Sequence, residues 1–104
     1  MTCANHECAH CHPPALRARR MPNIQALRCQ RIPGSFVHHG CGLSFICPCG
    51  CGGESYLRRG PVCCGPSWDF CGSLDRPTLS PSIYNVAMPC QWHGFLRGGE
   101  WQPC

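Results

Sequence analysis

The stretch CPCGCGG, residues 47–53, places three cysteines at alternate positions, separated by a proline and a glycine. Cys51 followed by Gly52 resembles the second half of a metal knuckle, a tight turn that aims two side chains at one ion. No cysteine pair in the stretch has the usual spacing of two intervening residues, so the partner of Cys51 is either Cys49 or Cys47. We therefore predict half of a zinc site here, with Cys49 as the first choice and Cys47 as its alternative.

The other half of the predicted site lies in the stretch PCQWHG, where two residues separate Cys90 from His93. Zinc takes four nitrogen or sulfur ligands in a tetrahedron, and closed cysteine-rich sets are typically structural. The predicted ligand set is Cys49, Cys51, Cys90 and His93.

The N-terminus MTCANHECAHCH holds a second group of cysteines and histidines. Two of its pairs have knuckle spacing, and cysteines further along the chain could complete a second zinc site. The candidate ligands are Cys3, His6, Cys8, Cys11, Cys29 and Cys41. The remaining cysteines are core thiols, ligands or disulfides: Cys63, Cys64, Cys71 and Cys104.

The composition predicts that disulfides or metal sites supply part of the stability. Leu, Ile, Val and Phe make up only 18 of 104 residues, too few for a core that is stable unaided. The 13 cysteines are odd in number, so they cannot all pair with one another. No stretch resembles a secretory signal or a membrane span, so we expect a protein of the reducing host cytoplasm, where zinc is favoured over disulfides.

The pattern of strands and turns predicts a small, mostly β, zinc-ribbon-like fold of short antiparallel hairpins with little helix. Residues 1–32 read as a Cys/His- and Arg-rich extension, with a short helix over 15–21, and residues 33–104 as the β domain. Pro81 should confine its strand to a sheet edge or a bulge. The predicted strands are Ser35–His39, Leu43–Cys47, Trp68–Cys71, Thr78–Tyr84, Phe95–Arg97 and Glu100–Gln102.

Catalytic alternatives are weaker. Cys49 with His93 could form a nucleophile and base, or an open zinc could activate water with Glu54 or Asp69 as base. However, the chain has only five acidic residues and no motif such as HExxH. We therefore predict a protein that is not an enzyme and has no catalytic residue.

Several stretches resemble a family of small uncharacterised phage and bacterial proteins. They are PGSFVHHG with LSFICPCGCG, Trp68, Gly72 with LSPSI, Cys90 with His93, and Trp101. Some members carry the label "ammonia monooxygenase", which their residues do not support, and some relatives resemble partners of bacterial ubiquitin-like conjugation systems. The resemblance implies a zinc-ribbon-like domain that is often phage-encoded.

The leading functional hypothesis is a phage-encoded, non-catalytic zinc-binding module that acts through a protein partner. One alternative is a structural component of a phage particle, which would place it in the virion. A further alternative is a nucleic-acid binder, because all nine basic residues are Arg and the net charge is +4. No membrane partner is expected.

Overall fold

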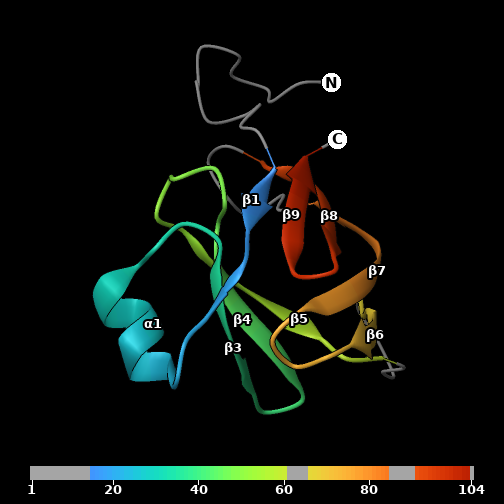
Figure 1. Ribbon diagram of the computed structural model, residues 1–104, viewed down its shortest axis with the longest axis horizontal. Helices are drawn as coiled ribbons and strands as arrows, with labels where there is room; N and C mark the ends of the chain where they lie inside the picture. Colours follow the sequence, from blue (N-terminus) through green and yellow to red (C-terminus); the bar gives the residue numbers. More distant parts are fainter. Residues whose placement is uncertain (1–14, 61–65, 85–90, 104) are drawn as a thin grey trace.

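The computed structural model describes residues 15–60, 66–84 and 91–103, which form two β-sheets and one short helix (Figure 1). The elements are β1 (Leu16–Arg17), β2 (Arg19–Arg20), α1 (Ile24–Gln30), β3 (Ser35–His39), β4 (Gly42–Ile46), β5 (Glu54–Arg58), β6 (Asp69–Gly72), β7 (Pro77–Tyr84), β8 (His93–Arg97) and β9 (Glu100–Pro103).

The first sheet has the strand order β1-β9-β8-β7-β6 and the second has the order β2-β3-β4-β5. All neighbouring strands run antiparallel except β2 and β3, which are parallel. The two-residue turn Gly98-Gly99 joins β8 to β9, and both glycines have positive φ, of 58° and 75°. This is the primed turn that the sequence predicts, because its twist matches that of the strands.

The main core lies between the two sheets. Phe36 and Phe45 from the second sheet pack in one buried cluster with Leu96 and Trp101 from the first. The Trp101 ring lies 4.8 Å from the Phe45 ring, and its indole N–H donates to the Gly34 carbonyl at 2.8 Å. The few large apolar side chains are therefore concentrated in one sandwich, as expected for sheets packed face to face.

A second, smaller cluster joins α1 to the opposite face of the second sheet. Leu27 of the helix is buried against Val37 and Ile46. The helix begins after Asn23, whose side chain accepts a hydrogen bond from the Ala26 N–H at 2.8 Å. The result is three layers: helix, sheet, sheet.

The helix predicted over residues 15–21 is wrong, because that segment forms β1 and β2. Leu16 pairs with Trp101, and Arg20 pairs with Phe36, so the segment extends across both sheets. Pairing with strands that are distant in sequence overrides the weak local helical preference. Whether residues 33–104 form a domain without residues 1–32 stays a prediction.

The mostly β fold with antiparallel hairpins and little helix is confirmed. The bulge predicted from Pro81 is also found, because the β7–β8 register shifts between Leu79 and Ile83. Within the described part of the chain, no helix is long and apolar enough to span a bilayer.

Candidate functional site

Three cysteines cluster in the loop between β4 and β5. The sulfur atoms of Cys47, Cys49 and Cys51 all lie within 4.8 Å of one another. Cys47 and Cys49 are buried beside the main core, whereas Cys51 is exposed. In a zinc tetrahedron with bonds of about 2.3 Å, the sulfur atoms are about 3.8 Å apart. The cluster therefore fits three corners of a metal site.

Backbone amides in this loop point at the sulfur atoms. The Cys51 N–H donates to Cys49 Sγ at 3.3 Å, and the Gly53 N–H donates to Cys51 Sγ at 3.4 Å. Such donors favour the thiolate, which is the form that binds a metal. Gly50 and Gly52 have φ of 93° and 83°, in the left-handed region where a side chain is disfavoured. The glycines of the opening motif thus let the backbone curl around the thiols.

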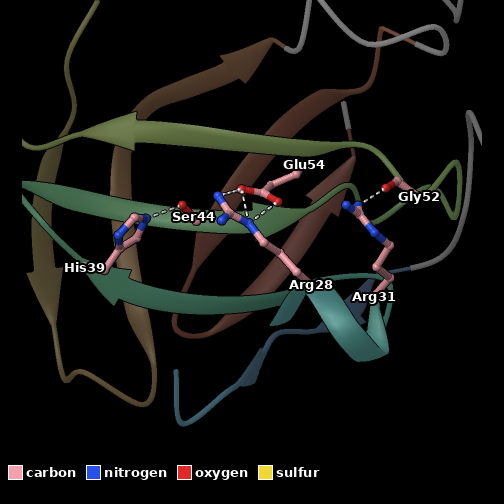
Figure 2. Close-up of polar contacts among 6 residues, drawn as sticks. All are labelled: Arg28, Arg31, His39, Ser44, Gly52 and Glu54. Atoms are coloured by element: carbon pink, nitrogen blue, oxygen red, sulfur yellow. Dashed lines mark hydrogen bonds and ion pairs between the residues drawn. The ribbon is translucent and has the colours of Figure 1, made fainter. Parts of the chain in front are cut away.

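Two arginines from the helix region contact the cysteine loop and the start of β5 (Figure 2). Arg31 donates to the Gly52 carbonyl at 2.7 Å. Arg28 forms a two-pronged contact with Glu54, with nitrogen–oxygen distances of 2.9 and 3.0 Å. The hydrogen bond from Arg28 lowers the pKa of the Glu54 carboxyl. Glu54, considered from sequence as a catalytic base, is therefore engaged in an ion pair.

The two alternatives for the first knuckle, Cys47 and Cys49, both belong to the cluster together with Cys51. His93 is not in this group; it lies on β8, and its Nε2 contacts Ser82. Cys90 lies outside the described residues.

For the predicted second metal site, Cys29 and Cys41 are exposed and belong to no cluster of potential ligands within the described ranges. The other candidates lie outside the described residues: Cys3, His6, Cys8 and Cys11.

A second constellation lies on the outer face of the five-stranded sheet. His93 Nε2 is 3.1 Å from Ser82 Oγ. Leu79 pairs with Leu96 and Ile83 pairs with Gly94, so three residues of β7 lie opposite a single residue of β8. β7 therefore bulges in the segment that contains Ser82. Bulges of this kind re-aim side chains and often adjoin active sites.

Residues around this pair hold it in place while leaving it accessible. Ile83 and Gly94 are buried on the core side, so Ser82 and His93 face the other side, where His93 is exposed. The indole N–H of Trp68 donates to the Ser82 carbonyl at 3.2 Å. The Tyr84 ring lies 5.1 Å from the His93 ring at an interplanar angle of 35°. The pair therefore lies on the outer face of the sheet, with His93 exposed and Ser82 half-buried.

Ser44 and His39 form another serine–histidine pair, with an Oγ–Nε2 distance of 2.6 Å (Figure 2). Ser44 lies in the middle of β4, between Val37 and Tyr56 on the neighbouring strands, and is only 2% exposed. A substrate carbonyl cannot reach a hydroxyl in this position. This pair satisfies a buried polar group rather than presenting a nucleophile.

Residues 20–104 match the model of a family described as "Bacterial ubiquitination-like system serine protease (BubE)". The chain belongs to the BubE family. No curated protein and no solved structure gives a significant match. The BubE family agrees with the part of the resemblance that concerned ubiquitin-like systems.

Membership of the BubE family contradicts the prediction that the protein is not an enzyme, because the family is named as a serine protease. The error has a physical cause. A serine and a histidine carry no recognisable spacing in sequence, since only the bulged β7–β8 pairing brings them together. The sequence did not indicate Ser82, and it suggested His93 as a zinc ligand or as a base for Cys49. The sequence did hold one indication of their importance, because both residues lie in stretches that carry the family resemblance.

Proposed function

We propose that the protein is a serine peptidase of a bacterial ubiquitination-like system, with Ser82 as nucleophile and His93 as general base. One observation carries this proposal: within the described residues, Ser82 and His93 are a serine–histidine pair at hydrogen-bond distance on an accessible face. The BubE family description supports the same reaction class. The protein partner expected from sequence is then the substrate.

The geometry supports the usual chemistry of acyl transfer. Ser82 Oγ attacks the scissile carbonyl while His93 Nε2 takes its proton, so Nδ1 carries the hydrogen in the resting imidazole. The protonated His93 then gives its proton to the leaving amine, and an acyl–Ser82 ester remains. Water, deprotonated by His93, hydrolyses this ester and releases the carboxylic acid. The contact with Tyr84 restrains the orientation of the imidazole, which is one of the two tasks of the carboxylate in a Ser-His-Asp triad.

For the cysteine cluster we propose a structural zinc. The donor set fits, because three thiols converge and backbone N–H groups stabilise their charged forms. Cys47, Cys49 and Cys51 would hold the ion, with Cys90 as the fourth ligand predicted from sequence. His93 serves as base in this proposal, since one Nε2 lone pair cannot bind zinc and accept the Ser82 proton. The zinc supplies stability and takes no part in hydrolysis.

A fluorophosphonate probe tests the catalytic proposal without knowledge of the substrate. Such probes form a covalent bond with an activated serine, and peptide mass spectrometry identifies the modified residue. We expect labelling at Ser82 that disappears in Ser82→Ala and falls sharply in His93→Ala. Ser44→Ala is the matched control, because it removes the other histidine-bound hydroxyl.

Labelling of Ser44, or labelling that survives Ser82→Ala, would contradict the assignment. Absence of labelling in the folded wild-type protein would also count against it. The circular dichroism spectrum and melting midpoint of each variant establish that it is folded before its labelling is compared.

A further inference from the structure

A cavity with a positive lining lies where the two sheets meet. Its volume is about 400 Å³, toward the lower end of the range of small-ligand sites. It is formed by the β3–β4 turn, the end of β5 and the segment between β6 and β7. The lining residues are His38, His39, Gly40, Cys41, Gly42, Arg59, Gly60 and Leu74.

Hydrogen bonds between the elements hold the walls of this cavity. The Arg59 N–H donates to the Cys41 carbonyl at 2.8 Å, and the Gly60 N–H donates to the Trp68 carbonyl at 3.0 Å. His38 Nε2 lies 3.0 Å from the Leu74 carbonyl, and it must be the donor because a carbonyl only accepts. The cavity is thus built from both sheets and does not depend on one mobile side chain.

Arg59 gives the cavity its charge. Neither Asp nor Glu is among the described lining residues, and Arg59 is in neither ion pair found in the described part of the chain. Its guanidinium lies 4.7 Å from the centre of the Phe70 ring. A cation–π contact of this kind restrains the guanidinium without using its N–H groups as hydrogen-bond donors. Arg59 is therefore a pre-oriented cation.

We propose that this cavity binds the carboxylate at the end of a peptide chain, with Arg59 as the anchoring residue. A planar guanidinium matches a carboxylate with two parallel hydrogen bonds. One arginine balances the single charge of a carboxylate, whereas phosphate near neutral pH carries closer to two charges. A Cβ at Gly42 would clash with the Leu57 carbonyl and one at Gly60 with the Ser67 side chain, so close packing keeps glycine at these wall positions.

This site is separate from the proposed function, because neither Ser82 nor His93 lines the cavity. The test is a titration of the ¹⁵N-labelled full chain, followed by NMR, with acetyl-glycyl-glycine and with its C-terminal amide. We expect the carboxylate to bind with millimolar affinity and to shift the amides of residues 38–42 and 59–60. The neutral amide should bind at least about tenfold more weakly, because it loses the charge-assisted hydrogen bonds.

Variants separate this site from general attraction to a basic protein. Arg59→Gln should weaken carboxylate binding about tenfold or more. Arg19→Gln removes the same charge from an exposed strand residue outside the cavity and should change the affinity less than about twofold. Equal losses in the two variants would overturn the proposal. The proposal would also be overturned if the amide bound as tightly as the carboxylate, or if the wild-type titration shifted only other residues. Both of these results come from the wild-type protein, so they do not depend on the folding of a variant.

Two further ligands distinguish the sources of negative charge. Acetate that binds as tightly as the peptide would overturn the peptide assignment, and phosphate that binds more tightly would overturn the carboxylate. Ser82→Ala should leave the titration unchanged. A loss of carboxylate binding in Ser82→Ala would refute the proposed cavity site and leave the catalytic proposal intact. Absence of probe labelling in a wild-type protein that still binds the carboxylate would refute the catalytic proposal and leave the cavity site intact.

Discussion

Two serine–histidine pairs in the described part of the chain each place Oγ within hydrogen-bond distance of Nε2, but in opposite surroundings. Ser44 and His39 lie 2.6 Å apart, with the serine buried in the centre of a sheet. Ser82 and His93 lie 3.1 Å apart on the outer face of the other sheet, where β7 bulges. The hydrogen bond alone does not distinguish a nucleophile from a satisfied polar group. Access for a substrate carbonyl does, and that depends on which face of which strand carries the serine.

The largest expected effect is on catalysis and falls on one pair only. Ser82→Ala should lower kcat on a peptide substrate on the order of 10⁶-fold, as removal of the nucleophile does in other serine proteases. Ser44→Ala should leave kcat unchanged within about twofold, because Ser44 does not face the substrate. Steady-state kinetics check both variants. A comparable loss in Ser44→Ala would erase the distinction between the pairs.

Loss of the metal site should disrupt both serine–histidine pairs, because it should unfold the sandwich that carries them. The cysteine loop joins β4, which carries Ser44, to β5 in that sandwich. We expect Cys49→Ser to lose bound zinc and several kcal/mol of the roughly 5–15 kcal/mol that stabilises a small domain. Elemental analysis and thermal unfolding measure the two effects. Cys29→Ser, at an exposed helix position, is the control and should change neither. Full zinc content in Cys49→Ser would remove this residue from the ligand set.

Tyr84 sharpens the comparison, because its ring is tilted only 35° from the His93 ring, whereas the ring of Tyr56 meets His39 of the buried pair edge-on at 63°. An aromatic contact is worth about 0.5–1.5 kcal/mol, so Tyr84→Ala should lower kcat about two- to tenfold with a smaller change in KM. Tyr84→Phe keeps the ring and should stay within twofold of the wild type. If the phenylalanine variant loses as much as the alanine variant, the hydroxyl and not the stacked ring is responsible.

The buried pair should be important for stability instead. Ser44→Ala leaves His39 Nε2 without its partner and removes one hydrogen bond, at a cost of about 1 kcal/mol. Urea unfolding monitored by fluorescence measures this difference. A variant as stable as the wild type would show that water replaces the hydroxyl at no cost.

The smallest effect concerns the Arg28–Glu54 pair beside the cysteine loop. Its hydrogen bond lowers the pKa of Glu54 in the folded state, so the pair stabilises the protein above the ordinary Glu pKa of about 4.3. That stability is lost as the pH falls through the lower, folded-state value. Glu54→Gln should therefore cost about 0.5 kcal/mol at pH 7, and the difference from wild type should vanish in acid. A difference that is independent of pH would exclude the charge as its source.

The local elements could be predicted where short-range chemistry sets them. Gly98-Gly99 specifies a tight turn between two strands, and Pro81 specifies an irregularity in its strand. The segment 15–21 could not be predicted, because its conformation comes from pairing with β9 and β3. The strand β5 was missed for a related reason: Glu54–Arg58 mixes polar and charged residues and alternates only weakly.

The sequence by itself determined that branched apolar residues are scarce, and from this we predict that cysteine cross-links or metal sites stabilise the fold. It also pointed to CPCGCGG as a candidate metal-binding loop, since its three thiols are closely spaced and glycines follow Cys49 and Cys51. Only the tertiary structure decided that all three thiols converge, and that Ser82 meets His93. Ligand loops are local, so their spacing is visible in sequence. A catalytic pair on neighbouring strands depends on register and on a bulge, and neither is encoded in the spacing of the two residues.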